Sequence, residues 1–369
     1  MYLFIGAIGA FIISLCMGMI LIPVLHKLKF GQEIREEGPK WHAKKSGTPT
    51  MGGLIFIAAI FAMSAICCVL GLFFGIDMPA DSTYLKTLVM LLCLSAVYGV
   101  IGFIDDYIKV ILKRNLGLTA KQKFLLQLVA AVGFVCWAVY GMDIATVVKI
   151  PFTSIELDFG IWFIPFAALV IIATVNSVNL TDGLDGLATC VTCMVALFFI
   201  LFADKVGNKA VALFASILLG SLMGFLMYNK FPAKVFMGDT GSTFLGFMLS
   251  VICIQGLFKG YVIISFIVPF LILGLPIFDT GFAIVRRIWN KKPIMAPDRG
   301  HLHHRLMDMG FSQKQTVAIL YVIASILAMS AVVVLEGGAY WAAVFVIAIV
   351  LFVIFAYKFY KTNHKESDI

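Results

Sequence analysis

Charged side chains are scarce in this sequence: Asp, Glu, Lys and Arg make up 13% of its 369 residues, whereas hydrophobic residues make up 62%. A soluble domain of this length carries far more polar surface, so the composition excludes that class of protein. It predicts an all-α, polytopic integral membrane protein. No linker is long enough to separate domains, and residues 1–369 are therefore expected to form a single transmembrane domain.

Several familiar motifs are missing as well. There is no Gly-x-Ser-x-Gly nucleophile elbow, which argues against acyl transfer, and neither Gly-x-Gly-x-x-Gly nor a Walker motif, which argues against an ATPase. No soluble basic domain is present that would bind nucleic acid. The eight cysteines all fall in apolar segments, where they are expected to pack rather than to form disulfides.

Basic residues are absent before Lys27, whereas a cleaved signal peptide carries its positive charge ahead of the apolar run. The first apolar run is therefore expected to be a retained span. Apolar runs of sufficient length predict about ten or eleven transmembrane helices. They lie at residues 2–25, 50–73, 87–104, 124–141, 161–179, 186–203, 210–228, 242–257, 261–285, 316–335 and 338–358.

Alternate loops differ sharply in positive charge. One set of loops, together with the tail, holds 23 of the 28 Lys and Arg residues, and the opposite set holds 5. The positive-inside rule then places the N-terminus outside and the tail in the cytoplasm. One outer loop, residues 146–163, alternates apolar and polar residues around Pro151 and predicts a short hairpin.

Polar residues interrupt the apolar pattern most strongly at residues 173–190, ATVNSVNLTDGLDGLATC. Asn179, Asp182 and Asp185 recur there at a spacing of three, which would line one side of a helical turn. Acids at the edge of an apolar span are costly, so they usually serve a function. An ordinary polar turn between two membrane helices is the alternative interpretation.

Two adjacent carboxylates, Asp105 and Asp106, close the third apolar run, and basic residues follow them. Neighbouring carboxylates repel one another unless a cation or a proton lies between them. We therefore expect the pair to be functional. Lys109 and Lys113 are expected to anchor this helix end at the lipid headgroups.

Residues 234–242, KVFMGDTGS, place Asp239 between two glycines at the predicted start of a helix. Backbone amides of such a loop can bind phosphate, and the carboxylate can bind Mg²⁺. Capping of the following helix by Asp239 is the alternative. Phe236 either faces lipid or forms a shelf for a nucleobase, and the sequence alone leaves both open.

Three of the six histidines, His301, His303 and His304, lie within four positions, with Arg299 and Arg305 beside them. A zinc site is one interpretation. The two arginines suit an anion better, so the segment predicts a clamp for a diphosphate. A solvated basic loop is the alternative.

All of these polar stretches fall on the cytoplasmic side of the predicted topology. Together they supply carboxylates for a hard cation, bases for phosphates and glycines for close backbone approach. This combination predicts Mg²⁺-dependent phosphoryl transfer at a bilayer surface. A secondary transporter is the alternative from another class, because intramembrane acids also mark ion paths.

The same residues resemble, in order and over nearly the whole chain, the motifs of the polyprenyl-phosphate N-acetylhexosamine-1-phosphate transferases. Residues 31–53 and 113–123 are similar to the phospho-N-acetylmuramoyl-pentapeptide translocase (MraY) family. Residues 293–305 and the eleventh span instead resemble the GlcNAc-1-phosphate transferases of the WecA and TagO type. The N-terminal blocks are long and specific, so we favour the MraY family and keep the WecA/TagO type as the alternative.

The resemblance implies transfer of phospho-MurNAc-pentapeptide from UDP-MurNAc-pentapeptide to undecaprenyl phosphate in the bacterial cytoplasmic membrane, giving lipid I and UMP, with Mg²⁺ as cofactor. The implied catalytic residues are Asp105, Asp106, Asp239, His303 and His304, with Asp239 as the metal ligand. The implied substrate-binding residues are Lys45, Lys121, Asn179, Asp182, Gly183, Leu184, Asp185, Asn229, Phe236, His301 and Arg305. Lys44 is an alternative to Lys45, and the oligomeric state, a homodimer included, stays open.

Overall fold

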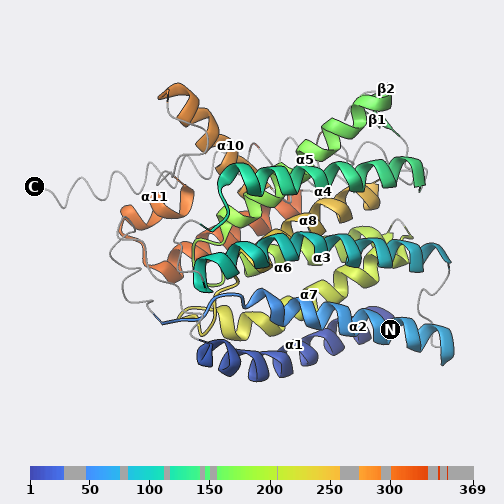
Figure 1. Ribbon diagram of the computed structural model, residues 1–369, viewed down its shortest axis with the longest axis horizontal. Coiled ribbons are helices and arrows are strands. Elements are labelled where there is room, and N and C mark those ends of the chain that lie inside the picture. Colours follow the sequence, from blue (N-terminus) through green and yellow to red (C-terminus); the bar gives the residue numbers. More distant parts are fainter. Residues whose placement is uncertain are drawn as a thin grey trace, which may run out of the picture.

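The computed structural model describes residues 1–28, 47–74, 82–111, 117–141, 146–149, 156–205, 207–257, 274–291 and 301–330, together with residues 340 and 347. This part of the chain is almost entirely helical, as the all-α prediction requires (Figure 1). The helices are α1 (Tyr2–Lys27), α2 (Gly53–Phe73), α3 (Ser82–Ile111), α4 (Ala120–Gly141), α5 (Phe163–Thr181), α6 (Leu187–Lys205), α7 (Lys209–Asn229), α8 (Gly238–Leu257), α10 (Gly274–Trp289), α11 (Leu302–Asp308) and a helix at Gln313–Ser330. A short 3-10 helix, η2 (Gly160–Trp162), precedes α5.

Eight helices of the described part are long and apolar enough to cross a membrane, which confirms a polytopic membrane protein. They match eight of the eleven predicted spans, and α8 runs through a ninth, at residues 242–257. The predicted span at 261–285 is described only from residue 274, where α10 begins. The predicted span at 338–358 lies outside the described residues, apart from residues 340 and 347.

Helix α3 ends later than the sequence predicts. The expectation that Asp105 and Asp106 close the helix is wrong, because α3 continues to Ile111 and both acids lie within it. Lys109, one turn further on, forms an ion pair with Asp105 at 2.6 Å, and such a pair supports the additional turn. The two carboxylates therefore project from a rigid helix rather than from a loop.

The polar stretch at residues 173–190 does not form the single helical face that the spacing of Asn179, Asp182 and Asp185 predicts. Helix α5 ends at Thr181, Asp182 follows at its C-terminal end, and Asp185 lies in the turn before α6. Gly186 closes this turn with φ +77°, a backbone conformation that suits glycine. Asn179 therefore lies in the last turn of α5, Asp182 lies at the end of that helix, and Asp185 lies in the tight turn that follows.

Close helix packing positions the site. Helix α3 packs along α8, and α1 packs along α7 (Figure 1). A Cβ atom at Gly102 of α3 would lie 2.2 Å from the backbone carbonyl oxygen of Asp239, so no larger residue fits there. Small residues allow this kind of approach between membrane helices. The acids of α3 are thereby brought to the first turn of α8.

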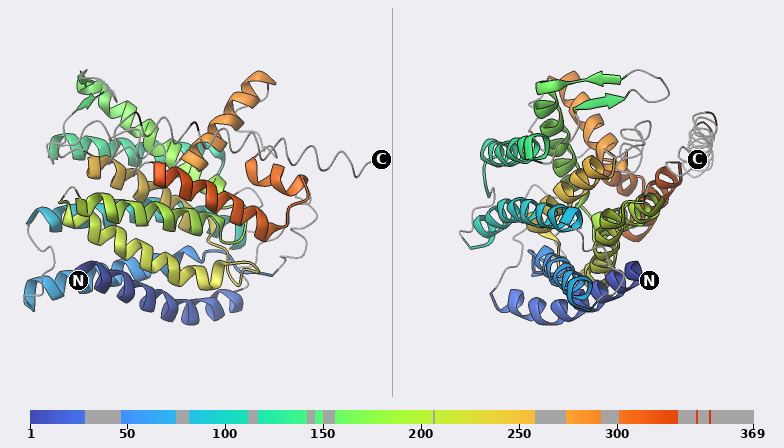
Figure 2. Two further views of the ribbon diagram at one scale, coloured as in Figure 1. Left: turned by 180° about the vertical axis from the view of Figure 1, so that it is seen from behind. Right: turned by 90° about the vertical axis from the view of Figure 1, so that its right-hand side faces the viewer.

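The predicted hairpin at residues 146–163 is confirmed. Strands β1 (Val147–Lys149) and β2 (Glu156–Asp158) pair antiparallel, with Val147 opposite Asp158. The hairpin and α11 lie at opposite ends of the helix bundle (Figures 1 and 2). This separation agrees with a topology in which the hairpin and the His-rich segment face opposite sides of the membrane. The side that faces the cytoplasm stays a prediction.

Candidate active site

The centre of the site is the junction between α3 and the first turn of α8. Asp106 is 3% exposed, and its Oδ1 accepts a hydrogen bond from the backbone N–H of Asp239 at 3.1 Å. Its Oδ2 accepts from the backbone N–H and the hydroxyl of Thr240, at 2.9 and 2.7 Å. The first N–H groups of a helix lack partners within the helix, and a carboxylate satisfies them well. Asp106, rather than Asp239, therefore caps α8.

Two ammonium groups bridge Asp105 and Asp239. The Nζ of Lys109 lies 2.6 Å from Oδ2 of Asp105 and also contacts the carboxylate of Asp239. The Nζ of Lys123, near the start of α4, lies 3.1 Å from Oδ2 of Asp239 and 3.7 Å from Oδ2 of Asp105. Oδ1 of Asp105 accepts the backbone N–H of Leu118 at 2.7 Å. These two ammonium groups offset the repulsion between the carboxylates of Asp105 and Asp239.

The carboxylate of Asp239 lies ahead of the apolar segment that begins at residue 242, and it is 14% exposed. Burial raises the pKa of this carboxyl, but the charges of Lys123 and Lys109 outweigh burial and hold the pKa well below its usual range. Asp239 is therefore ionised at neutral pH, which is the state that a metal ligand requires.

The carboxylate oxygens of Asp105 and Asp239, which both contact the ammonium group of Lys109, are also suitable ligands for a hard divalent metal. Such a metal commonly binds one or two carboxylates together with the phosphates of its substrate. Asp105 and Asp239 fit this donor set. Within the described residues, no group of three or more His, Cys, Asp or Glu side chains could hold a metal.

The segment at residues 47–53 lies along the connection between α7 and α8. The backbone N–H of Phe236 donates to the carbonyl oxygen of Pro49 at 2.8 Å, and the N–H of Gly52 donates to the carbonyl oxygen of Phe236 at 2.8 Å. A Cβ at Gly238 would lie 2.6 Å from Oδ2 of Asp106 and 2.7 Å from Oγ1 of Thr50. Gly238 also has φ +75°, so both space and backbone conformation require glycine here.

The turn between α5 and α6 is tied to α8 and to the connection before it. Oγ of Ser242 donates to Oδ1 of Asn179 at 3.2 Å. Oδ2 of Asp185 accepts the backbone N–H of Ala233 at 3.1 Å. These contacts place the polar turn at the same end of the bundle as the carboxylate cluster.

The His-rich segment packs over this turn. A Cβ at Gly183 would lie 2.7 Å from Nε2 of His303, so the imidazole occupies the space that a side chain would fill. The rings of His301 and His303 stack with their centroids 5.9 Å apart and 6° between their planes. The ring of His304 lies 4.2 Å from that of His303, centroid to centroid.

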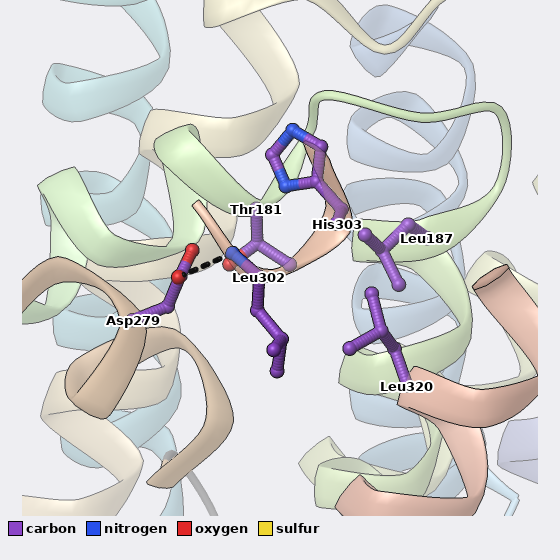
Figure 3. A pocket seen from close by; sticks show the side chains of 6 residues that line it. All are labelled: Thr181, Leu187, Asp279, Leu302, His303 and Leu320. Atoms are coloured by element: carbon purple, nitrogen blue, oxygen red, sulfur yellow. Dashed lines mark hydrogen bonds between the residues drawn. The ribbon is translucent and has the colours of Figure 1, made fainter. Parts of the chain in front are cut away.

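Asp279 of α10 holds the start of this segment. One carboxylate oxygen lies 2.9 Å from Nδ1 of His301, and the other accepts the backbone N–H of Leu302 at 2.8 Å. Figure 3 shows the bond from Leu302 to Asp279 at the edge of a small pocket. The pocket is lined by Thr181, Leu187, Asp279, Leu302, His303 and Leu320.

Comparisons with known proteins agree with this geometry. A family model described as glycosyl transferase family 4 matches residues 88–257, and one described as phospho-N-acetylmuramoyl-pentapeptide-transferase signature 1 matches residues 45–57. The phospho-N-acetylmuramoyl-pentapeptide-transferase of Halalkalibacterium halodurans is 40% identical over 328 residues, which cover 88% of this chain and 94% of that protein. The chain belongs to the phospho-N-acetylmuramoyl-pentapeptide-transferase family.

Further members of this family give the same result. The proteins of that name from Clostridium kluyveri and Clostridium botulinum are 39% and 41% identical, over 86% of this chain in both cases and over 94% and 91% of their own lengths. The predicted MraY family is thus confirmed. The signature at residues 45–57 supports it over the WecA/TagO alternative.

The structure brings many residues with an implied family role to one end of the bundle. The α3–α8 junction holds Asp105, Asp106 and Asp239, and the adjoining helix end, turn and His-rich segment hold Asn179, Asp182, Gly183, Leu184, Asp185, His301, His303 and His304. Leu184 is buried in an apolar cluster with Leu306 and Leu320, which fastens the His-rich segment to the turn. Arg305 is exposed on α11.

Other predicted residues have different surroundings. Asn229 is 2% exposed, accepts the Thr189 hydroxyl at 2.8 Å and donates to the Val235 carbonyl oxygen at 3.0 Å. These bonds hold the end of α7 to α6 and to the loop before α8. Lys121 is exposed, and Phe236 is half-buried. Lys45, its alternative Lys44, and Arg299 lie outside the described residues.

Sequence reasoning missed three members of the site. Headgroup anchoring is wrong for Lys109, whose ammonium lies between two carboxylates; its spacing of four from Asp105 was the available signal. Lys123, to which the sequence assigned no role, lies 3.1 Å from Asp239. Asp279 and its partner His301 are 22 positions apart, so no local pattern reveals their contact. Lys113 lies outside the described residues.

Proposed function

We propose that this protein transfers phospho-MurNAc-pentapeptide from UDP-MurNAc-pentapeptide to undecaprenyl phosphate, giving lipid I and UMP. The observation that carries the proposal is the pair of carboxylates, Asp105 and Asp239, which share a cation beside the segment that matches the family signature. The relatives carry this transferase activity in their names. The reaction would take place in the cytoplasmic membrane of a bacterium, with the site open to the cytoplasm, where the nucleotide donor is found.

Mg²⁺ fits the oxygen donors of Asp239 and Asp105, and when bound it would offset the charge of the donor diphosphate and stabilise the departing UMP. Lys109 and Lys123 neutralise the two carboxylates in the structure described here. With donor bound, their ammonium groups can turn to phosphate oxygens, since both side chains retain some exposure, 32% and 16%.

The transfer step exchanges one P–O bond for another. An oxygen of the acceptor phosphate attacks the phosphorus that bears the sugar, and the bond from that phosphorus to UMP breaks, so UMP leaves with the bridging oxygen. Asp105 is the carboxylate of the α3 pair that faces cations, and it orients the acceptor phosphate or takes its proton. Asp106 holds α8, and thus Asp239, in place.

The remaining family roles are assigned to the donor. His303 and His304, with Arg305 on the exposed side of α11, receive the diphosphate near Gly183. Asn179, Asp182 and Asp185 shape the nucleotide pocket, and Phe236 stacks near the uracil. Lys45 and Lys121 keep their proposed contacts to phosphate and nucleotide sugar. Asn229 acts through the loop that it holds.

The test is release of UMP by the purified protein in detergent. We expect UMP only when UDP-MurNAc-pentapeptide, undecaprenyl phosphate and Mg²⁺ are all present, and no UMP after chelation with EDTA. Re-addition of Mg²⁺ should restore the rate. A secondary transporter would release no UMP under any of these conditions, but would move a solute into proteoliposomes, and that result would replace the present proposal.

A further inference from the structure

The carboxylate of Asp279 makes two contacts with residues more than twenty positions further along the chain. Oδ1 accepts the backbone N–H of Leu302 at 2.8 Å, and Oδ2 lies 2.9 Å from Nδ1 of His301. The Asp279 side chain is 17% exposed and that of His301 is 5% exposed. A single side chain of α10 therefore fixes both the backbone and the first imidazole of the His-rich segment.

The contact to His301 also determines which ring nitrogen carries the proton. An ionised carboxylate only accepts hydrogen bonds, so Nδ1 of His301 must donate to it. The backbone N–H of Leu302 donates to the other oxygen, so the carboxylate cannot rotate without losing a hydrogen bond. A carboxylate behind an imidazole is a common device for fixing both the tautomer and the orientation of the ring.

The ring of His301 in turn stacks on that of His303. The two rings are almost parallel, with 6° between their planes, and each residue is 4% exposed. His303 also lies where a side chain at Gly183 would be. Leu302, between the two histidines in the sequence, lines the pocket together with Leu187 and Leu320 (Figure 3). His303 is thus in contact both with the ring of His301 and with the turn between α5 and α6.

We propose that Asp279 is a positioning residue that sets His301 as a platform and so holds His303 over the α5–α6 turn, in register with the donor diphosphate. This proposal rests on the proposed function, because it is that function which gives His303 a phosphate to meet. Asp279 itself does not touch the reacting atoms. Its effect on turnover passes through His303, which makes the proposal testable by a double-mutant cycle.

The informative variant is Asp279→Asn. An Asn side chain has the same shape and can still accept the Leu302 N–H, but its amide group faces Nδ1 of His301 with a donor and forces the opposite tautomer. We expect kcat/KM for UDP-MurNAc-pentapeptide to fall about ten- to a hundredfold, because small misplacements of a substrate-contacting group are costly. The melting temperature should stay close to that of the unchanged protein. Asp308→Asn, at the exposed end of α11, makes the same chemical change and should leave kcat/KM within about twofold.

The cycle with His303→Ala decides whether the effect passes through His303. If it does, Asp279→Asn added to His303→Ala lowers kcat/KM by less than about twofold further. Losses that multiply in the double variant would show that Asp279 acts elsewhere, and unchanged kcat/KM in Asp279→Asn would overturn the proposal outright.

A second readout separates this proposal from the proposed function. Nitrogen-15 NMR of protein labelled at histidine, with His301→Gln to assign the signal, reports the His301 tautomer without any turnover. We expect the protonated nitrogen to change from Nδ1 to Nε2 in Asp279→Asn. An unchanged His301 signal would refute the positioning of His301 by Asp279, even if UMP is released. If the unchanged protein releases no UMP, the proposed function fails, and the positioning role toward a diphosphate fails with it, whatever the tautomer.

Discussion

Thr240 donates both its backbone N–H and its hydroxyl to a single carboxylate oxygen of Asp106, at 2.9 and 2.7 Å. The other oxygen accepts the N–H of Asp239, so three donors from the first turn of α8 end on one side chain of α3. Asp105, next in sequence, instead contacts Lys109 and lies near Lys123. Two adjacent acids therefore have different tasks: Asp106 joins two helices, and Asp105 belongs to the charged cluster.

The first prediction compares Asp106→Asn with Asp105→Asn. At Asp106 an amide group would face an N–H or hydroxyl donor, and leaving such a buried group unsatisfied costs about 1–3 kcal/mol. At Asp105 the asparagine can still accept the Leu118 N–H. We expect the melting temperature in detergent, without substrates, to fall clearly for Asp106→Asn and little for Asp105→Asn, whereas UMP release should be lost in Asp105→Asn. Equal melting temperatures for the two variants would contradict the capping role of Asp106.

The second prediction concerns Asp239→Asn. Removing one ligand charge should lower the rate of UMP release on the order of a thousandfold or more, because the charge of the transition state is no longer offset. The fold should persist, since the backbone N–H of residue 239 still reaches Asp106. Asp204→Asn, at the exposed end of α6, is the control and should behave as the unchanged protein. Substantial activity of Asp239→Asn at saturating Mg²⁺ would remove Asp239 from the metal site.

The sequence predicts the helices of this protein well and their ends less well. Hydrophobic runs of bilayer length give the spans because the membrane demands them. The end of α3 is not set by hydrophobicity, since Asp105 and Asp106 find partners in α8 and Lys109 and can stay inside the helix. The turn after α5 is likewise set by Gly186 and its positive φ rather than by the spacing of the acids.

The chemistry of the site is readable from motifs, but its pairings are not. Lys121 and Lys123 are two positions apart near the start of α4, so they point to different faces of the helix. Only the packing of α4 against its neighbours determines which lysine reaches the carboxylates. The contact between Asp279 and His301 joins α10 to the residue that precedes α11, and it arises from tertiary packing alone.

The third prediction tests the lysine assignment. Lys123→Ala should lower kcat/KM for the donor tenfold or more, because a charge-assisted contact contributes about 1.5–3 kcal/mol and 1.4 kcal/mol corresponds to a factor of ten. Lys121→Ala should lower kcat/KM less than Lys123→Ala does, because Lys121 is exposed and its proposed contact is to the nucleotide sugar rather than to the carboxylates. Both variants remove the same charge from the same helix, so the comparison cancels any effect of net charge. A greater loss of kcat/KM in Lys121→Ala than in Lys123→Ala would contradict this ranking of the two lysines.

The last prediction concerns the choice of donor. UDP-MurNAc-pentapeptide and UDP-GlcNAc share the nucleotide, the diphosphate and the sugar ring, and they differ in a lactyl-peptide arm that must leave the pocket toward the cytoplasm. The groups described at the carboxylate cluster and the α5–α6 turn serve the parts that the donors share. Discrimination must therefore come from segments nearer the opening, where a clash with the arm would reject one donor as effectively as new contacts would favour the other.

The segment at residues 45–57 matches the family signature, and its described part lies beside Gly238 at the start of α8. Residues 293–305 instead resemble enzymes that use the plain sugar. We expect the first segment to frame an open groove that admits the peptide arm. The kcat/KM for UDP-MurNAc-pentapeptide should then exceed that for UDP-GlcNAc on the order of a hundredfold or more. The reason is that polar groups of the site which bind the arm are left without partners when the donor lacks it. Each donor is offered separately to the purified protein with undecaprenyl phosphate and Mg²⁺, and UMP is measured. A preference for UDP-GlcNAc would reassign the substrate while leaving the roles of Asp105, Asp106 and Asp239 intact, because the acceptor phosphate, the start of α8 and the metal that they serve are the same with either donor.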